Sequence, residues 1–250
     1  MTTTVCDMGR RVLATDCRWS WQTPEAILYV DDVGFEKMLY TGDAIYQFAG
    51  NSGVIQEWKD FMSTEPGSST HRPTLDGISL VVYDVGRHEI VLAHNCFNIA
   101  DPENQARAVS IFSGTGMVHA LPAWSIHRCA YKAVEHAVAM DPFSGGPTKF
   151  FETNDCTHNL MDVIRVDGIN RALPLKGYVM TKPNVETKLG EPVPASEAAA
   201  NDPAIRDVVE RIAQGEMAPS APFMYMLHKA TAEQNESADR ALDAFFARNR

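Results

Sequence analysis

A threonine directly follows Met1 in the opening stretch MTTTVCDMGRRVLATDCRWSW. If Met1 is removed, Thr2 carries a free α-amino group beside its own hydroxyl. A hydroxyl is a poor nucleophile without a neighbouring base, and an N-terminal amine is one recognised base for threonine. The pKa of an unperturbed α-amine, about 7.7–8.0, lies close to neutral pH. Thr2 is therefore a candidate nucleophile with its own base, although small residues are common at position 2.

Three further residues could supply what a threonine nucleophile lacks. Lys37, in EKMLY, offers a cation that helps to keep the amine neutral, and Asp16, in ATDCRWSW, offers a carboxylate to hold that cation. Gly50, in FAGNSG, lies where a strand is expected to meet a helix, so its backbone N–H could bind an oxyanion. Each residue also has an ordinary structural explanation. Asp16 could cap a turn, Lys37 could be a solvated strand residue, and Gly50 could end a strand.

We expect β-hairpins to position these residues. Alternating Val, Thr, Leu and aromatic side chains predict strands, and the turn residues between them predict hairpins. We expect hairpins around Met8–Arg10, Thr41-Gly42-Asp43 and Gly86-Arg87, and strands in KFFETN (149–154) and DVIRVD (162–167).

Helices are expected where apolar residues recur at helical spacing. These ranges are 52–62, 123–140, 204–214 and 232–247, with loops at 63–74 and 141–148 and a Pro/Glu/Ala-rich linker at 191–203. Hairpins grouped with helices between them favour an α+β layered architecture over an alternating parallel sheet. We expect one domain over 2–190, followed by a linker and a C-terminal helical extension over 191–250.

The composition excludes several classes of function. A net charge of −10 argues against nucleic acid as the main partner. No apolar run is long enough to span a membrane, and the N-terminus lacks the pattern of a signal peptide, so we expect no membrane partner and no targeting segment. The five cysteines are scattered without a CxxC pair, which favours a reducing cytoplasm and no structural metal.

Six segments, taken together, resemble the proteasome β-subunit family of N-terminal-nucleophile hydrolases. They occur in the family's order over roughly residues 2–170: TTTV, ATDCRWSW, EKMLY, FAGNSGVIQEW, FSGTG and MDPFSGGPT. Within the family, the chain is most similar to the homomeric bacterial proteasome homologue of β-proteobacteria, because we expect no propeptide before the threonine and the C-terminus is extended.

The resemblance implies a four-layer αββα sandwich of two antiparallel sheets. It also implies catalysis without a cofactor or metal. The substrate would lie extended between two strands, with the first specificity pocket near Ser20, Lys37, Ile45 and Ser52. The implied catalytic residues are Thr2, Asp16, Lys37, Gly50, Thr115, Asp141 and Ser144, and the implied substrate-binding residues are Ser20, Ile45, Gly50 and Ser52.

The family also implies self-assembly. The expected partners are a peptide or unfolded protein substrate, further copies of the chain in stacked rings of fourteen subunits, and an ATPase unfoldase. Two other functions stay open: a non-catalytic ring subunit, and an amidase acting on small amides. The sequence departs from the family in three ways. Thr115 replaces the family's usual Ser, and the spacing from Asp16 to Lys37 and on to Gly50 differs from the common one. Residues 63–74 are too short and too rich in helix-breaking residues for the family's usual second helix. Either that helix is missing or the C-terminal helices take its place.

Overall fold

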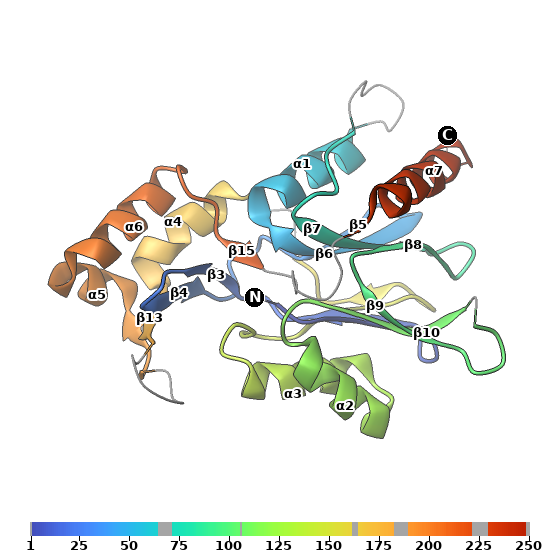
Figure 1. Cartoon of the computed structure of the whole chain (residues 1–250), viewed down its shortest axis with the longest axis horizontal. Helices are drawn as coiled ribbons and strands as arrows, with labels where there is room; N and C mark the ends of the chain where they lie inside the picture. The colour runs from blue at the N-terminus through green and yellow to red at the C-terminus, as the bar shows by residue number, and fades with distance from the viewer. Residues whose placement is uncertain are drawn as a thin grey trace.

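The computed structural model of the chain describes residues 2–64, 72–105, 107–161, 165–182, 190–221 and 230–248. These residues form four layers: two antiparallel sheets lie face to face, and helices cover the outer face of each (Figure 1). The predicted α+β class and αββα layering are confirmed.

The first sheet has the strand order β12-β11-β2-β1-β10-β9. Its outer face packs against α2 and α3 through Val5, Ala14 and Phe112. The β1–β2 turn is held by Asp7, whose carboxylate accepts hydrogen bonds from the backbone N–H groups of Gly9 and Arg10. The bounds are β1 (Thr4–Asp7), β2 (Val12–Thr15), β9 (Phe97–Ala100), β10 (Ala108–Ser113), β11 (Lys149–Glu152), β12 (Thr157–His158), α2 (Met117–His127) and α3 (Ala130–Met140).

The second sheet has the order β14-β13-β4-β3-β15-β6-β7-β8, and β5 also pairs with β6. Its strands are β3 (Trp19–Gln22), β4 (Ala26–Val30), β5 (Met38–Tyr40), β6 (Ala44–Asn51), β7 (Ile78–Asp84), β8 (Glu89–His94), β13 (Tyr178–Thr181), β14 (Val193–Pro194) and β15 (Ser220–Ala221). Its outer face carries α1 (Ser52–Ser63), α4 (Asp167–Lys176), α5 (Ala195–Asn201), α6 (Pro203–Ala213) and α7 (Ala232–Arg248) (Figure 1).

Strand β6 shows how alternation divides the core. Tyr46 and Phe48 point to the helices of the outer layer, whereas Ile45 packs between the sheets. Polar groups also join the two sheets, since Gln47 Nε2 donates to the carbonyl of Ala14 at 2.8 Å. A site placed between the sheets is therefore held by both.

The three predicted hairpins are present, as are helices at the predicted positions of α1, α6 and α7. The single helix expected over 123–140 is wrong: α2 ends and α3 begins around Arg128 and Cys129. Arg128 adopts a left-handed backbone (φ 47°) with its guanidinium 4.5 Å from the centre of the Trp124 ring, and Cys129 is extended. A left-handed residue ends a helix, so the chain turns back here.

Two further expectations are corrected. Residues 191–203 are not a linker, because they contain β14 and α5, with Ala195 buried. In DVIRVD, Arg165 and Val166 are not in a strand and Asp167 begins α4, while residues 162–164 lie outside the described part of the chain. The strand that pairs with β11 is instead β12.

The C-terminal helix α7 lies beside α1. The rings of Phe61 and Phe246 are 5.6 Å apart, and Arg72 forms ion pairs with Asp239 and Asp243. Of the two alternatives for the family's second helix, the described residues therefore show a C-terminal helix next to α1. Of the loop expected at 63–74, residues 65–71 lie outside the described residues. Of the helices that the structure describes, none combines the length and hydropathy needed to cross a bilayer.

Candidate active site

Thr2, Asp16 and Lys37 meet between the two sheets. Lys37 Nζ donates to Thr2 Oγ1 at 2.6 Å and to Asp16 Oδ1 at 2.8 Å, and the Thr2 hydroxyl donates to the same Asp16 oxygen. All three residues are buried. Thr2 precedes β1, Asp16 follows β2 and Lys37 precedes β5, so three separate strands converge on one hydroxyl.

The Asp16 carboxylate is held by backbone as well as side chains. Its Oδ1 accepts from the N–H of Thr3 at 2.9 Å, and its Oδ2 accepts from the N–H groups of Arg18 and Gly145, both at 3.1 Å. Such charge-assisted hydrogen bonds are what a buried carboxylate requires. Asp16 is therefore fixed in orientation, and it fixes Lys37 in turn.

Lys37 is positioned to act on the Thr2 oxygen. An ammonium group at hydrogen-bond distance favours negative charge on that oxygen as its proton leaves. The Lys37 backbone is anchored because its carbonyl accepts from the N–H of Phe48 in β6 at 2.8 Å. The neighbouring Glu36 carbonyl accepts a hydrogen bond from the buried Lys59 Nζ on α1.

Asp141 and Ser144 form a second group beside the first. Ser144 Oγ donates to Asp141 Oδ2 at 2.8 Å and shares a hydrogen bond of 2.7 Å with Thr3 Oγ1. Thr115 Oγ1 donates a long hydrogen bond of 3.5 Å to Asp141 Oδ2. These residues meet Thr3, and the Thr2–Thr3 peptide links them to the Asp16 group.

The glycines of FSGTG fit tightly around the N-terminal residues. The N–H of Gly116 donates to the carbonyl of Thr2 at 3.1 Å. A Cβ on Gly114 would lie closer than 3.0 Å to the Thr2 carbonyl oxygen, and one on Gly116 would overlap Thr3 Oγ1. Only glycine fits at either position, which sequence reasoning missed even though it singled out the segment.

Gly50 and Ser52 lie where β6 meets α1. Gly50 has φ +130°, and a Cβ there would overlap the backbone of Gly77 and Ile78, so the position requires glycine. Ser52 is fully buried, and its hydroxyl has no hydrogen-bond partner among the described residues. Asn51 caps α1, since its side chain accepts from the N–H groups of Gly53 and Val54.

The other two predicted substrate-binding residues, Ser20 and Ile45, lie in different parts of the second sheet. Ser20 is buried in β3 and is the register partner of Ser220 in β15. Ser220 is also the partner of Asn51 in β6, so β15 runs between the strands that carry Ser20 and Gly50. Ile45 is apart from them, in the core between the sheets.

Arg18 is a site residue whose role sequence reasoning missed. Its guanidinium pairs with both carboxylate oxygens of Asp31 at 2.8 Å and donates to the carbonyl of Pro142 at 2.6 Å. It also lies 3.7 Å from the centre of the Tyr29 ring. Arg18 thereby holds the loop that brings the Gly145 N–H to Asp16. The only sequence signal was its place in ATDCRWSW.

The thiol of Cys17, next to Asp16 in the chain, is not in its reactive form. Burial raises the pKa of Cys17 to about 12, although the charge on Lys37 acts in the opposite direction. The thiolate is the reactive form of cysteine, so Cys17 stays an inert thiol at neutral pH.

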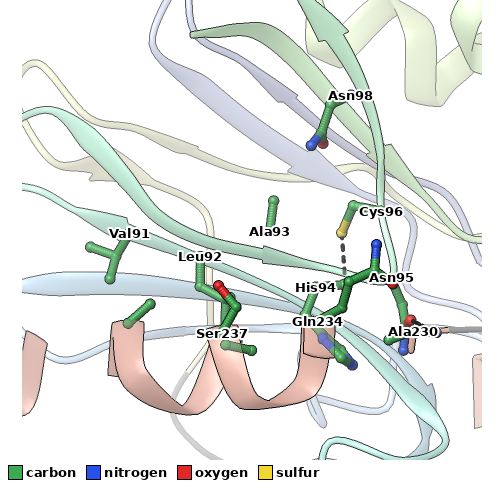
Figure 2. Close-up of a pocket in the computed structure, with 12 residues that line it drawn as sticks. Val91, Leu92, Ala93, His94, Asn95, Cys96, Asn98, Ala230, Gln234 and Ser237 are labelled. Atoms are coloured by element: carbon green, nitrogen blue, oxygen red, sulfur yellow. Dashed lines mark hydrogen bonds between the residues drawn. The ribbon is translucent and has the colours of Figure 1, made fainter. Parts of the chain in front are cut away.

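A cavity of about 420 Å³ lies elsewhere, between β8 and α7 (Figure 2). His94, Asn95, Cys96 and Gln234 are among the described residues that line it, and Cys96 Sγ donates to the carbonyl of His94 at 3.1 Å. Burial lowers the pKa of His94. None of the predicted site residues is among its described lining residues.

No protein-family model and no curated protein sequence matches the chain. Among solved structures, it is similar to Thiobacillus denitrificans BPH, with 16% identity and a TM-score of 0.42 over 60% of this chain and 96% of that one. A structure of Thiobacillus denitrificans BPH in complex with epoxomicin gives 15% identity and a TM-score of 0.37, over 60% and 97%. Eukaryotic HslV from Trypanosoma brucei gives 14% and 0.36, again over 60% and 97%. Values this low do not establish a family or an activity for this chain.

Proposed function

We propose that the chain is a threonine-type endopeptidase of the proteasome kind, with Thr2 as the N-terminal nucleophile after removal of Met1. The observation that carries the proposal is the buried cluster in which Lys37 Nζ lies 2.6 Å from Thr2 Oγ1 and 2.8 Å from Asp16 Oδ1. A buried ion pair is costly to desolvate and adds little stability by itself. Activation of the Thr2 hydroxyl as a nucleophile would account for an ion pair at this buried position.

In the proposed reaction, Thr2 Oγ1 attacks the carbonyl carbon of a peptide bond, and its proton passes to the free α-amine, directly or through a water. Lys37 stabilises the charge that develops on Oγ1, and Asp16 holds Lys37 in place. The C–N bond then breaks as the α-amine returns the proton to the leaving amine. Water hydrolyses the resulting ester, which releases the acid and restores Thr2.

Four further residues assist in this proposal. Gly50 supplies a backbone N–H to the oxyanion of the tetrahedral intermediate. Asp141, Ser144 and Thr115 orient the α-amine. Supporting this, Ser144 is hydrogen-bonded to Thr3, the residue next to that amine.

The substrate would be a peptide or unfolded protein in an extended conformation, paired with β3 and β6. Ser20, Gly50 and Ser52 lie on or next to those strands. The buried hydroxyl of Ser52, which has no hydrogen-bond partner in the described part of the chain, supports a polar contact there, because an unsatisfied buried hydroxyl costs about 1–3 kcal/mol. From the resemblance of the six sequence segments to the proteasome β-subunit family, we propose that the chain assembles into stacked rings in the cytoplasm. An ATPase unfoldase would supply the substrate.

Mass spectrometry of the N-terminus, with and without an epoxyketone that captures N-terminal threonine, tests the function. We expect Met1 to be absent and Thr2 to be modified. Thr2→Ala should lower peptide hydrolysis by about a thousandfold or more while leaving the protein folded. Thr2→Ser, which keeps both hydroxyl and amine, is the matched control and should retain turnover. Full activity in Thr2→Ala would overturn the mechanism.

A further inference from the structure

The short strand β15 occupies an unusual position in the second sheet. It lies between β3 and β6, with Ser220 opposite Ser20 on one side and Asn51 on the other, and Ala221 opposite Gly50 (Figure 1). In the part of the chain that the structure describes, β15 alone joins the two halves of this sheet. Without it, β3 and β6 would present facing edges about 9–10 Å apart, a gap one extended chain wide.

This gap adjoins the Thr2 hydroxyl. Lys37 and β15 bind the same edge of β6, since β7 occupies the other edge. Lys37 pairs there at Phe48 and Ala221 at Gly50, two residues or about 7 Å further along. On the other side of the gap, the Trp19 ring next to Ser20 lies 5.5 Å from Lys37 Nζ. A chain in this gap therefore runs past the proposed nucleophile.

The sequence around β15 favours an extended segment with few backbone donors. Pro219 precedes it and Pro222 follows it in the chain. A residue before proline is biased towards extended conformations, and proline cannot donate a ladder hydrogen bond. Among the described residues, β15 comprises Ser220 and Ala221, and neither flanking proline has a backbone N–H to donate to a ladder.

We infer that Ser220–Ala221 is a built-in occupant of the peptide-binding gap, which must leave before a substrate peptide can pair with β3 and β6. This inference rests on the proposed function for its consequence, which is autoinhibition. Peptides commonly bind by adding a strand to a sheet edge, and here the chain's own segment already does so.

A binding experiment tests the occupancy without requiring catalysis. The protein is the full chain carrying Thr2→Ala, and the probe is a fluorescein-labelled peptide with the sequence of residues 217–223, MAPSAPF. Adding Ser220→Pro removes a backbone N–H from the internal strand, so the probe should bind about tenfold more tightly. Ser220→Ala keeps the backbone and is the matched control. A probe with proline in place of its serine should bind weakly.

A disulfide provides the opposite test. Ser20 and Ser220 are register partners, so Ser20→Cys with Ser220→Cys can be oxidised to lock β15 in place. The oxidised protein should bind the probe at least about tenfold more weakly than the same protein after reduction, and Ser220→Cys alone should show no such difference. Equal binding in the oxidised and reduced forms, or no effect of Ser220→Pro, overturns the inference.

The two proposals fail separately. If Ser220→Pro and the disulfide change probe binding but the epoxyketone does not modify Thr2, the strand-occupancy inference stands and the peptidase function is wrong. If Thr2 is modified and peptides are hydrolysed, but neither Ser220→Pro nor the disulfide has an effect, the peptidase function stands and the occupancy inference is wrong.

Discussion

Single residues set the electrostatics of the candidate site. Lys37 and Asp16 are charged groups with no exposed side-chain surface, and each is the other's ion-pair partner. Asp16 also binds three backbone N–H groups, so it has a firm position without the lysine. Lys37 depends on Asp16 and Thr2 for its partners. Removing the lysine would therefore leave Asp16 in place but withdraw the cation from Thr2 Oγ1.

Replacing Lys37 by methionine should lower both activity and stability. The Asp16 charge would remain buried without its counter-ion, which costs about 3–5 kcal/mol in comparable buried pairs. Urea unfolding and the rate of Thr2 modification by the epoxyketone measure the two effects. Lys182→Met is the control, because Lys182 is only partly buried and donates to a backbone carbonyl. A Lys37→Met protein that is modified at the wild-type rate would exclude a role for Lys37.

Lys59 should give the stability a distinct pH dependence. Burial lowers its pKa in the folded protein from 10.5 to about 8, while Glu36 acts in the opposite direction. Between those pH values the unfolded chain holds a proton that the folded protein has released, so the free energy of unfolding rises with pH, by about 3 kcal/mol. Below pH 8 the contribution is constant.

Chemical unfolding of wild type and Lys59→Met between pH 7 and pH 11 measures this term. The difference between the two proteins is needed because other groups titrate in the opposite sense. Burial raises the pKa of Cys17 and of Tyr46 to about 12, so those groups favour unfolding as the pH rises. Parallel pH profiles for the two proteins would show that Lys59 is not perturbed.

At the scale of elements, the site depends on loops that approach β1 closely. The 114–116 loop touches the backbone of Thr2 and the side chain of Thr3, and the 141–145 loop reaches Asp16. Their effect is to restrict where the N-terminal residues can lie, which is the main requirement for a nucleophile that sits at the end of a chain.

Gly114→Ala should displace the N-terminal residues. Gly114 has φ +84°, and its added Cβ would overlap the Thr2 carbonyl. Gly42→Ala is a matched control, because Gly42 has φ +92° but no atom within 4 Å of the added Cβ. Both changes cost about 1–2 kcal/mol of backbone strain, but only Gly114→Ala should also abolish Thr2 modification. Equal modification of the two variants would mean that the loop does not position Thr2.

At the scale of the whole molecule, the four layers bury the site from both sides. The site lies between the two sheets, and helices cover the outer face of each sheet (Figure 1). The described C-terminal elements are part of this architecture, since α7 packs on α1 and β15 enters the second sheet. The predicted division of the chain at residue 190 stays a prediction.

Assembly is the prediction that belongs to this scale. If the chain forms stacked rings, size-exclusion chromatography with light scattering should give the mass of fourteen chains of 27.6 kDa. By its apolar sequence, the stretch APSAPFMYMLH (218–228) is a candidate contact surface, with ordinary packing of the C-terminal extension as the alternative. Residues 222–228 of this stretch lie outside the described residues. A species with the mass of one chain would exclude the ring.

The sequence by itself determined the hairpins around Met8–Arg10 and Thr41–Asp43 and the helix that begins at Ser52, because their patterns and turn residues are local. It also selected Thr2, Asp16 and Lys37, whose residue types suit the chemistry. Their contact depends on three strands meeting, and only the tertiary structure decided that.

The tertiary structure also decided features that no local pattern encodes. The helix break at Arg128 is stabilised by a left-handed backbone and a contact with Trp124. Ser144 reaches Thr3 across 141 residues of chain, and Ser220 reaches Ser20 across two hundred. Pairings at such separations depend on the register of whole sheets rather than on the propensity of a short segment. The prolines at 219 and 222 favour an extended segment, but the place of Ser220 and Ala221 between β3 and β6 comes from the folded sheet alone.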